Sequence, residues 1–150
     1  MKFRVVCVGR PRDTAVASLV EESERRATRY WPLEIVEVRE GRGTDAALVR
    51  RQEAARLREA CGASMIVACD ERGTALESAA FAERMQGWRE AARDVTFVVG
   101  GAHGLDLVVL APSTTLQLAR WTLPHELARL ILAEQLYRAG TIVRREPYHK

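Results

Sequence analysis

The stretch that decides the fold of this chain is Val95-Thr96-Phe97-Val98-Val99, followed at once by Gly100-Gly101-Ala102-His103-Gly104. Its first half is almost continuously apolar and rich in β-branched residues, which is typical of a strand covered on both faces of a parallel sheet. The glycines let the backbone approach a ligand closely, although a glycine pair by itself more often marks a plain turn. The pattern is neither the G-x-G-x-x-G of dinucleotide folds nor a P-loop, and it favours a ligand without phosphates.

Strand-like and helix-like segments alternate along the rest of the chain. We predict strands at residues 3–8, 33–38, 65–69, 95–99 and 115–119, and helices at about 13–30, 44–61, 78–92 and 124–139. Asp13 and Thr44 are the predicted N-caps of the first two helices, and Asp70-Glu71-Arg72-Gly73 is predicted to be the exit loop of the third strand. This alternation predicts an α/β fold with a mostly parallel sheet and helices on both faces.

Composition limits the class of protein. The 150 residues are 47% hydrophobic and 29% charged, which suits one globular domain over residues 1–150. A net charge of +3 is compatible with an RNA partner. The three cysteines have no C-x-x-C spacing, so we expect reduced thiols in a cytoplasmic protein and no metal. No segment has the length of a membrane span or the pattern of a signal peptide, so we expect no membrane partner.

Three predicted strands end in loops that suit a ligand. In open parallel sheets, ligands bind beyond the carboxyl ends of the strands. The exits after Cys69, after Val99 and from Ala119 onward would surround one pocket if these strands are neighbours. We expect Gly101 to face that pocket, so that a side chain added there would fill it. Of the three tryptophans, Trp121 is the one we expect near the site.

Several short motifs occur in a fixed order along the chain. They are Asp70-Glu71-Arg72-Gly73, the run 97–104, Thr122-Leu123-Pro124-His125, the run 133–139 and the terminal Pro147-Tyr148-His149-Lys150. Each is weak alone, but their order, ending at the last residue of a short chain, is specific. Through these motifs, and over its whole length, the chain closely resembles the bacterial ribosomal RNA large subunit methyltransferase H family, small members of the SPOUT class of methyltransferases.

The resemblance implies an enzyme that uses S-adenosylmethionine to methylate N3 of a pseudouridine in 23S rRNA of the ribosome. It implies a homodimer and a C-terminal trefoil knot. By position, the cofactor contacts of the family fall on Cys69, Gly101, Ala119, Arg120, Trp121, Thr122, Leu123 and Pro124. Cys69 stands where an aliphatic residue is common in the family, and Arg120-Trp121 is bulkier than usual.

The same resemblance implies that the C-terminal tail serves the chemistry. The N3 imide proton must leave, and His149 is the best candidate base because its ordinary pKa of about 6.5 lies near neutrality; the alternative is a frayed terminus. Tyr148 is a candidate for stacking on an unpaired base. Arg138 is the third candidate, although a helical pair with Glu134, four residues earlier, explains it equally well.

The last predicted helix carries apolar residues on more than one face. Such a helix needs cover on two sides, and we expect the sheet to supply one and a second subunit the other. The tail of one subunit would then act beside the pocket of its partner. The alternative function is a non-catalytic ribosome-associated RNA-binding protein of the same fold, which would bind no S-adenosylmethionine. A flavodoxin-like nucleotide binder is disfavoured because a phosphate-cradling loop is missing.

Overall fold

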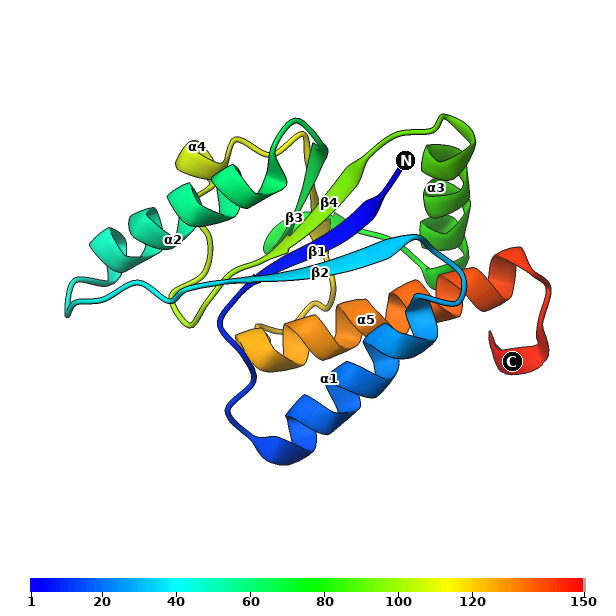
Figure 1. The fold of residues 1–150 in the computed structure, drawn as a ribbon, viewed down its shortest axis with the longest axis horizontal. Coiled ribbons are helices and arrows are strands. Elements are labelled where there is room, and N and C mark those ends of the chain that lie inside the picture. The colour runs from blue at the N-terminus through cyan, green and yellow to red at the C-terminus, as the bar shows by residue number, and fades with distance from the viewer. Residues whose placement is uncertain (150) are drawn as a thin grey trace.

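All five strands form one parallel sheet in the order β2-β1-β4-β3-β5 (Figure 1). The computed structural model describes residues 1–149 of the chain. The strands are β1 (Phe3–Val8), β2 (Leu33–Val38), β3 (Met65–Ala75), β4 (Val95–Val99) and β5 (Thr114–Gln117). The deciding stretch is the central strand β4, whose residues are all buried. The predicted α/β class and parallel sheet are therefore confirmed.

Helices cover both faces of the sheet, as predicted. They are α1 (Thr14–Ala27), α2 (Ala46–Cys61), α3 (Ser78–Glu90), α4 (Leu107–Leu110), α5 (His125–Val143) and the 3-10 turn η1 (Pro147–His149). Helices α1, α3 and α5 enclose the larger core, around Phe3, Trp31 and Phe97. Helices α2 and α4 cover the opposite face, over Val6 and Val98. In Figure 1 the sheet lies between α2 and α4 above and α1 and α5 below.

Carboxylates cap the first two helices, and one of the two predicted caps is wrong. Asp13 caps α1 as expected, accepting hydrogen bonds from the N–H groups of Ala15 and Val16 at 2.9 and 3.0 Å. Helix α2 begins after Asp45 rather than Thr44, and the Asp45 carboxylate accepts from the N–H of Ala47 at 3.0 Å. A carboxylate at this position satisfies free N–H groups and also complements the positive end of the helix dipole.

Strand β3 does not end at Cys69, which corrects the predicted exit loop. Cys69 and Thr74 both align with Leu116 of β5, so the intervening residues form a bulge inside a longer strand. Gly73 permits this, because a Cβ there would lie 2.7 Å from the backbone of Leu116. The bulge contains the acidic residues Asp70 and Glu71. Strand β5 correspondingly ends at Gln117 instead of residue 119.

The last helix is longer than predicted and begins one residue later. Pro124 occupies the N-cap position, and α5 continues past Ala139 to Val143. Gly140 lies inside the helix and does not end it. The ring of Tyr30 occupies the space that a side chain at Gly140 would need. Helix α3 ends at Glu90, earlier than the predicted residue 92. The short α4 was not predicted, and the predicted trefoil knot stays a prediction.

Candidate functional site

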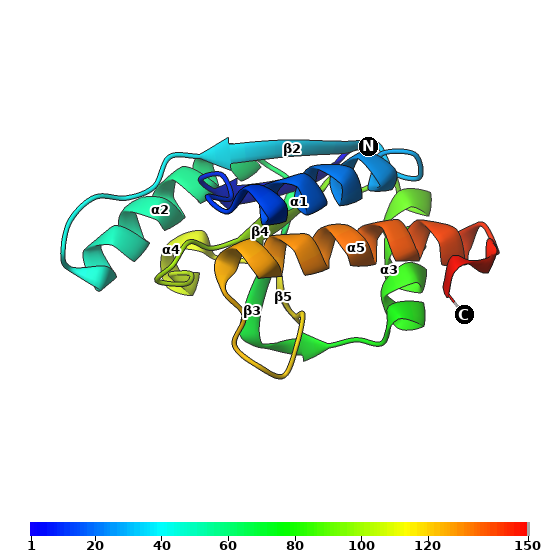
Figure 2. The same ribbon diagram turned by 90° about the horizontal axis from the view of Figure 1, so that it is seen from below.

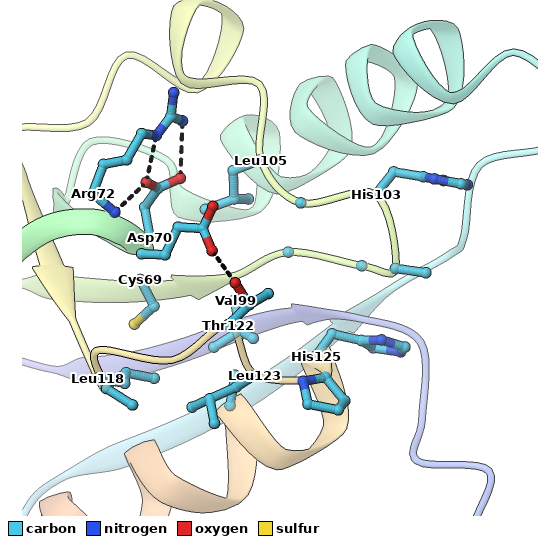
Figure 3. Close-up of a pocket in the computed structure, with 18 of the residues that line it drawn as sticks. Cys69, Asp70, Arg72, Val99, His103, Leu105, Leu118, Thr122, Leu123 and His125 are labelled. Carbon is cyan, nitrogen blue, oxygen red and sulfur yellow. Dashed lines mark hydrogen bonds and ion pairs between the residues drawn. The ribbon is translucent and has the colours of Figure 1, made fainter.

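A pocket of about 830 Å³ opens beside the bulge of β3, the carboxyl end of β4 and the loop that joins β5 to α5 (Figure 3). Because β4, β3 and β5 are neighbours in the sheet, the three predicted loops do surround one space. The lining residues are Arg50, Cys69, Asp70, Glu71, Arg72, Val99, Gly100, Gly101, Ala102, His103, Gly104, Leu105, Leu118, Ala119, Trp121, Thr122, Leu123, Pro124, His125 and Ala128. The sheet topology therefore produces a site where the strand exits predict one.

The structure brings together nearly all of the residues predicted to contact a cofactor. Those on the pocket wall are Cys69, Gly101, Ala119, Trp121, Thr122, Leu123 and Pro124. Arg120, in the same loop, is exposed and is not among the lining residues. His103 and His125 also reach the wall (Figure 3). The grouping is observed, and the cofactor contacts themselves stay a prediction.

The glycine loop after β4 is a tight turn pressed against α2. The Gly104 N–H donates to the Gly101 carbonyl at 3.0 Å, and Gly104 has a positive φ of 78°. A Cβ at Gly101 would lie 2.8 Å from Glu53 Oε2 and 3.2 Å from a methyl of Val8. The missing side chain of Gly101 therefore points into the protein. The prediction that a side chain at Gly101 would fill the pocket is wrong.

Glu53 of α2 is a buried carboxylate beneath this loop that the sequence did not indicate. Its Oε1 accepts from the Gly41 N–H at 3.0 Å, which joins α2 to the segment after β2. Its Oε2 has no hydrogen-bond partner among residues 1–149. A single glutamate in a helix with several charged residues gives no signal of burial, so only the packing identifies it.

The β3 bulge forms a polar rim on the pocket. Arg72 donates to Asp70 from its Nε at 2.9 Å and from its backbone N–H at 2.9 Å. The hydrogen bond from Arg72 outweighs partial burial and lowers the pKa of Asp70. Glu71 accepts from the Thr122 hydroxyl at 2.6 Å, and its carbonyl accepts from the Gln117 amide at 2.7 Å. The Thr122 bond, dashed in Figure 3, holds the β5–α5 loop against the bulge, and the Gln117 bond attaches the end of β5 to it.

Cys69 supplies a neutral sulfur to the pocket wall. Burial raises the pKa of its thiol to about 12, so it is protonated at neutral pH. Burial likewise raises the pKa of the Cys7 thiol to about 12. Within residues 1–149, no three His, Cys, Asp or Glu side chains gather in a way that would hold a metal ion. Over the same residues, no helix has both the length and the apolar character needed to cross a bilayer.

A buried charge network fixes the first turns of α5 behind the pocket. Arg129 is 6% exposed and donates to Glu24 at 2.7 and 3.1 Å and to Glu37 at 2.7 Å. Arg10 donates to the second oxygen of Glu37 at 2.8 Å. Partial burial acts to raise the pKa of Glu37, but the hydrogen bonds from both arginines lower it. The network joins α1, β2 and α5, and no sequence motif indicated it.

The predicted tail residues form a second cluster. Arg138 pairs with Glu134 at 2.8 Å, as the helical spacing predicts. The Tyr148 hydroxyl donates to Glu134 at 3.2 Å, and the Arg138 guanidinium lies 5.0 Å from the centre of the Tyr148 ring. Burial and the Glu134 charge raise the pKa of Tyr148. His149 ends η1, and its side chain lies outside the described part of the structure.

The pocket and the tail cluster lie at opposite ends of α5. His125 starts the helix at the pocket, and Arg138 follows thirteen residues later. At 1.5 Å per residue, about 20 Å of helix separates them. In Figure 2 the red segment of η1 lies beyond the far end of α5 from the start of that helix. Within one chain, the structure therefore does not bring Arg138 and Tyr148 to the pocket.

Comparison with known proteins agrees with this architecture. A family model described as "Predicted SPOUT methyltransferase" matches residues 1–149. The chain is 50% identical to a ribosomal RNA large subunit methyltransferase H of Gemmatimonas aurantiaca, over 100% of both chains. It is 49% identical to a protein of the same name from Anaeromyxobacter sp. strain Fw109-5, again over 100% of both. Because the match extends over the pocket loops, α5 and η1, the chain belongs to the SPOUT methyltransferase family.

Proposed function

We propose that this protein methylates N3 of a pseudouridine in 23S rRNA, with S-adenosylmethionine as methyl donor. The observation that carries the proposal is the pocket formed by the β3 bulge, the loop after β4 and the β5–α5 loop, in a chain of the SPOUT family. Relatives of 49–50% identity are named for large-subunit rRNA methylation, which supports an rRNA substrate. We further propose that residues 1–150 act as one domain, in the cytoplasm.

The pocket residues fit S-adenosylmethionine. A volume of about 830 Å³ lies within the usual range for small-molecule sites. Leu118, Leu123 and the neutral Cys69 sulfur offer apolar contacts, and Asp70 and Glu71 suit a cationic ligand. When bound, the cofactor would supply an electrophilic methyl group. We propose that Cys69, Gly101 and the segment from Ala119 to Pro124 hold it, with Arg120 acting from outside the wall.

The chain must also remove the N3 proton and align the base. We propose His149 as the base, because an imidazole near its ordinary pKa accepts a proton readily at neutral pH. Tyr148 is 42% exposed, so its ring is accessible to a base. Arg138 already lies over the Tyr148 ring, and we propose that it orients this ring and contacts phosphate.

These roles require a second copy of the chain. Because about 20 Å of α5 separates the tail cluster from its own pocket, we propose a homodimer in which each tail serves the partner's pocket. The expectation that a second subunit must cover the second apolar face of α5 is corrected by the packing within one chain. Helices α1 and α3 of the same chain flank α5, so a partner is not needed to cover most of its apolar residues. The remaining half-exposed stripe includes Leu127 and Ile131, and we propose it as the interface.

Calorimetry tests the proposal against a non-catalytic RNA-binding protein of the same fold. Titration with S-adenosylmethionine should give a saturable heat, whereas a pure RNA-binding module should give none. Purified protein should then transfer a labelled methyl group to ribosomes from a strain that lacks the gene. Mass mapping of 23S rRNA from that strain should locate the missing methyl group. Cofactor binding without any methyl transfer to ribosomes would contradict the proposal.

A further inference from the structure

Trp121 is an exposed tryptophan at the mouth of the pocket. It is 84% exposed, although it belongs to the pocket wall. The other two tryptophans are less exposed: Trp31 is buried and donates to the Leu136 carbonyl at 2.8 Å, and Trp88 is partly buried and packs against Phe97 with ring centres 6.0 Å apart. Tryptophan is highly buried on average, so an indole left in water at a site mouth indicates a surface that a ligand or partner covers.

The loop that carries Trp121 is held in place. Its neighbour Thr122 donates to the Glu71 carboxylate at 2.6 Å, and Gln117 at the end of β5 donates to the Glu71 carbonyl at 2.7 Å. Both bonds attach the loop to the bulge of β3. The indole is therefore presented from an anchored loop, which reduces the entropy lost when another ring stacks on it.

The charge around the mouth favours a polyanion. Arg120, next to Trp121, is exposed and has no carboxylate partner among residues 1–149. Arg50 also lines the pocket, and its only hydrogen bond among residues 1–149 is a long contact of 3.5 Å with the carbonyl of His103. In the proposed homodimer the partner carries the same net charge of +3, so it would not neutralise these arginines. A nucleic acid would bring both phosphates and aromatic rings.

We infer that Trp121 is a stacking platform for a base of the substrate RNA at the pocket mouth, with Arg120 and Arg50 positioned for its phosphates. The inference rests on the proposed function, since it assigns a recognition residue to that site. Unpaired RNA bases commonly stack on aromatic side chains, and cationic grooves hold the backbone beside them. Trp121 would thus help to hold the substrate where its target base can enter the pocket.

Acrylamide quenching of tryptophan fluorescence tests this directly, because Trp121 is the exposed one of three tryptophans. A short single-stranded RNA of mixed sequence should quench the emission and protect the accessible fraction from acrylamide. Trp121→Phe should abolish this response while leaving the signal of Trp31 and Trp88. Protection by S-adenosylmethionine that RNA does not increase further would overturn the inference, because Trp121 would then serve only the cofactor. Protection that rises with protein concentration and that RNA does not increase further would overturn it in favour of a second copy.

Kinetics on ribosomes provide the second test. Trp121→Ala should raise KM for ribosomes by roughly 5- to 150-fold, the range that base–aromatic stacking gives, and Trp121→Phe should restore most of the loss. Val108→Ala, at a 90% exposed residue of α4 outside the pocket, is the matched control and should leave KM unchanged. An unchanged KM in Trp121→Ala would overturn the inference but not the proposed function. Failure of the wild-type protein to bind S-adenosylmethionine would contradict the proposed function instead.

Discussion

Gly101 lies directly against Glu53, so that a methyl group on the Gly101 Cα would approach Glu53 Oε2 to 2.8 Å. This contact joins the glycine loop at the pocket to a buried carboxylate of α2. Since that carboxylate also accepts from the Gly41 N–H, one side chain supports two loops. A larger residue at position 101 would therefore clash with Glu53, and this clash accounts for the glycine more directly than contact with a ligand does.

We expect Gly101→Ala to lower the free energy of unfolding by about 1–3 kcal/mol, because the added methyl group overpacks a buried site. Urea denaturation measures the change. Glu53→Ala in the same chain should relieve part of the loss, so the double mutant should be more stable than the sum of the single mutants predicts. Strict additivity would contradict the contact. Gly87→Ala in α3 is the control, because a Cβ there meets no atom within 4 Å and should stabilise the helix slightly.

The ion pair of Asp70 and Arg72 predicts a pH-dependent contribution to stability. The folded pKa of Asp70 is lowered by Arg72, so the pair stabilises fully above the ordinary aspartate pKa of about 3.9. This contribution is lost as the pH falls through the lower folded value. Arg72→Gln should therefore lower Tm at pH 7, and only slightly, because Arg72 is mostly exposed and solvent screens the pair.

Thermal melts of both proteins between neutral and strongly acidic pH measure this effect. The gap in Tm between wild type and Arg72→Gln should close at the acidic end. Arg84→Gln serves as the control, because Arg84 is exposed and forms no ion pair among residues 1–149. A gap that widened with acidification would contradict the assignment.

Arg129 should be one of the most sensitive charged residues of the chain. Replacing it with methionine leaves Glu24 and Glu37 without their shared cation, and breaking a buried ion pair costs about 3–5 kcal/mol. Urea denaturation measures the loss. Arg26→Met removes an exposed pair with Glu22, which Arg25 also contacts, and should cost far less. Equal losses in the two variants would show that burial does not govern the cost.

Deleting Tyr148 to Lys150 should separate chemistry from folding. Tyr148 is 42% exposed, so we expect thermal stability to change by no more than about 1 kcal/mol. Affinity for S-adenosylmethionine should stay close to that of the wild type, because the pocket lies at the other end of α5. Methyl transfer to ribosomes should fall sharply. Full single-turnover activity in the truncated protein would remove the tail from the mechanism.

A base role for His149 makes a further prediction about pH. His149→Ala should slow the chemical step more than it weakens ribosome binding, and the loss should shrink as rising pH ionises the N3 imide unaided. Single-turnover rates across a range of pH measure this. If His149 only contacts RNA, binding weakens and no such rescue with pH occurs.

Mixing two inactive variants tests whether the site is shared between protomers. His149→Ala inactivates the tail, and Leu123→Arg places a bulky cation in the pocket. After subunit exchange, a mixed dimer would contain one intact tail beside one intact pocket, and random pairing would restore about a quarter of wild-type activity. Each variant alone should stay inactive. No recovery, with exchange verified by mass, would place tail and pocket within one chain.

Local patterns in the sequence were sufficient to predict that the five strands exist and that the fold is α/β. The apolar run of β4, the alternation of β2 and the carboxylate of Asp13 act through their nearest neighbours, so periodicity and capping rules apply to them directly. The position of the pocket also followed, because parallel strands place their exits at one edge of the sheet. The motifs shared with a known family supplied the candidate residues that the pocket brings together.

Contacts between distant segments had to come from the tertiary structure. Leu116 of β5 determines the β3 bulge, and Tyr30 accommodates α5 at Gly140. Glu53 occupies the space beside Gly101, and the length of α5 separates Arg138 from the pocket. In each case the second residue of the pair lies far along the chain, or a whole helix separates the two residues. Its effect on a backbone or a side chain arises from three-dimensional packing, which local residue preferences do not encode.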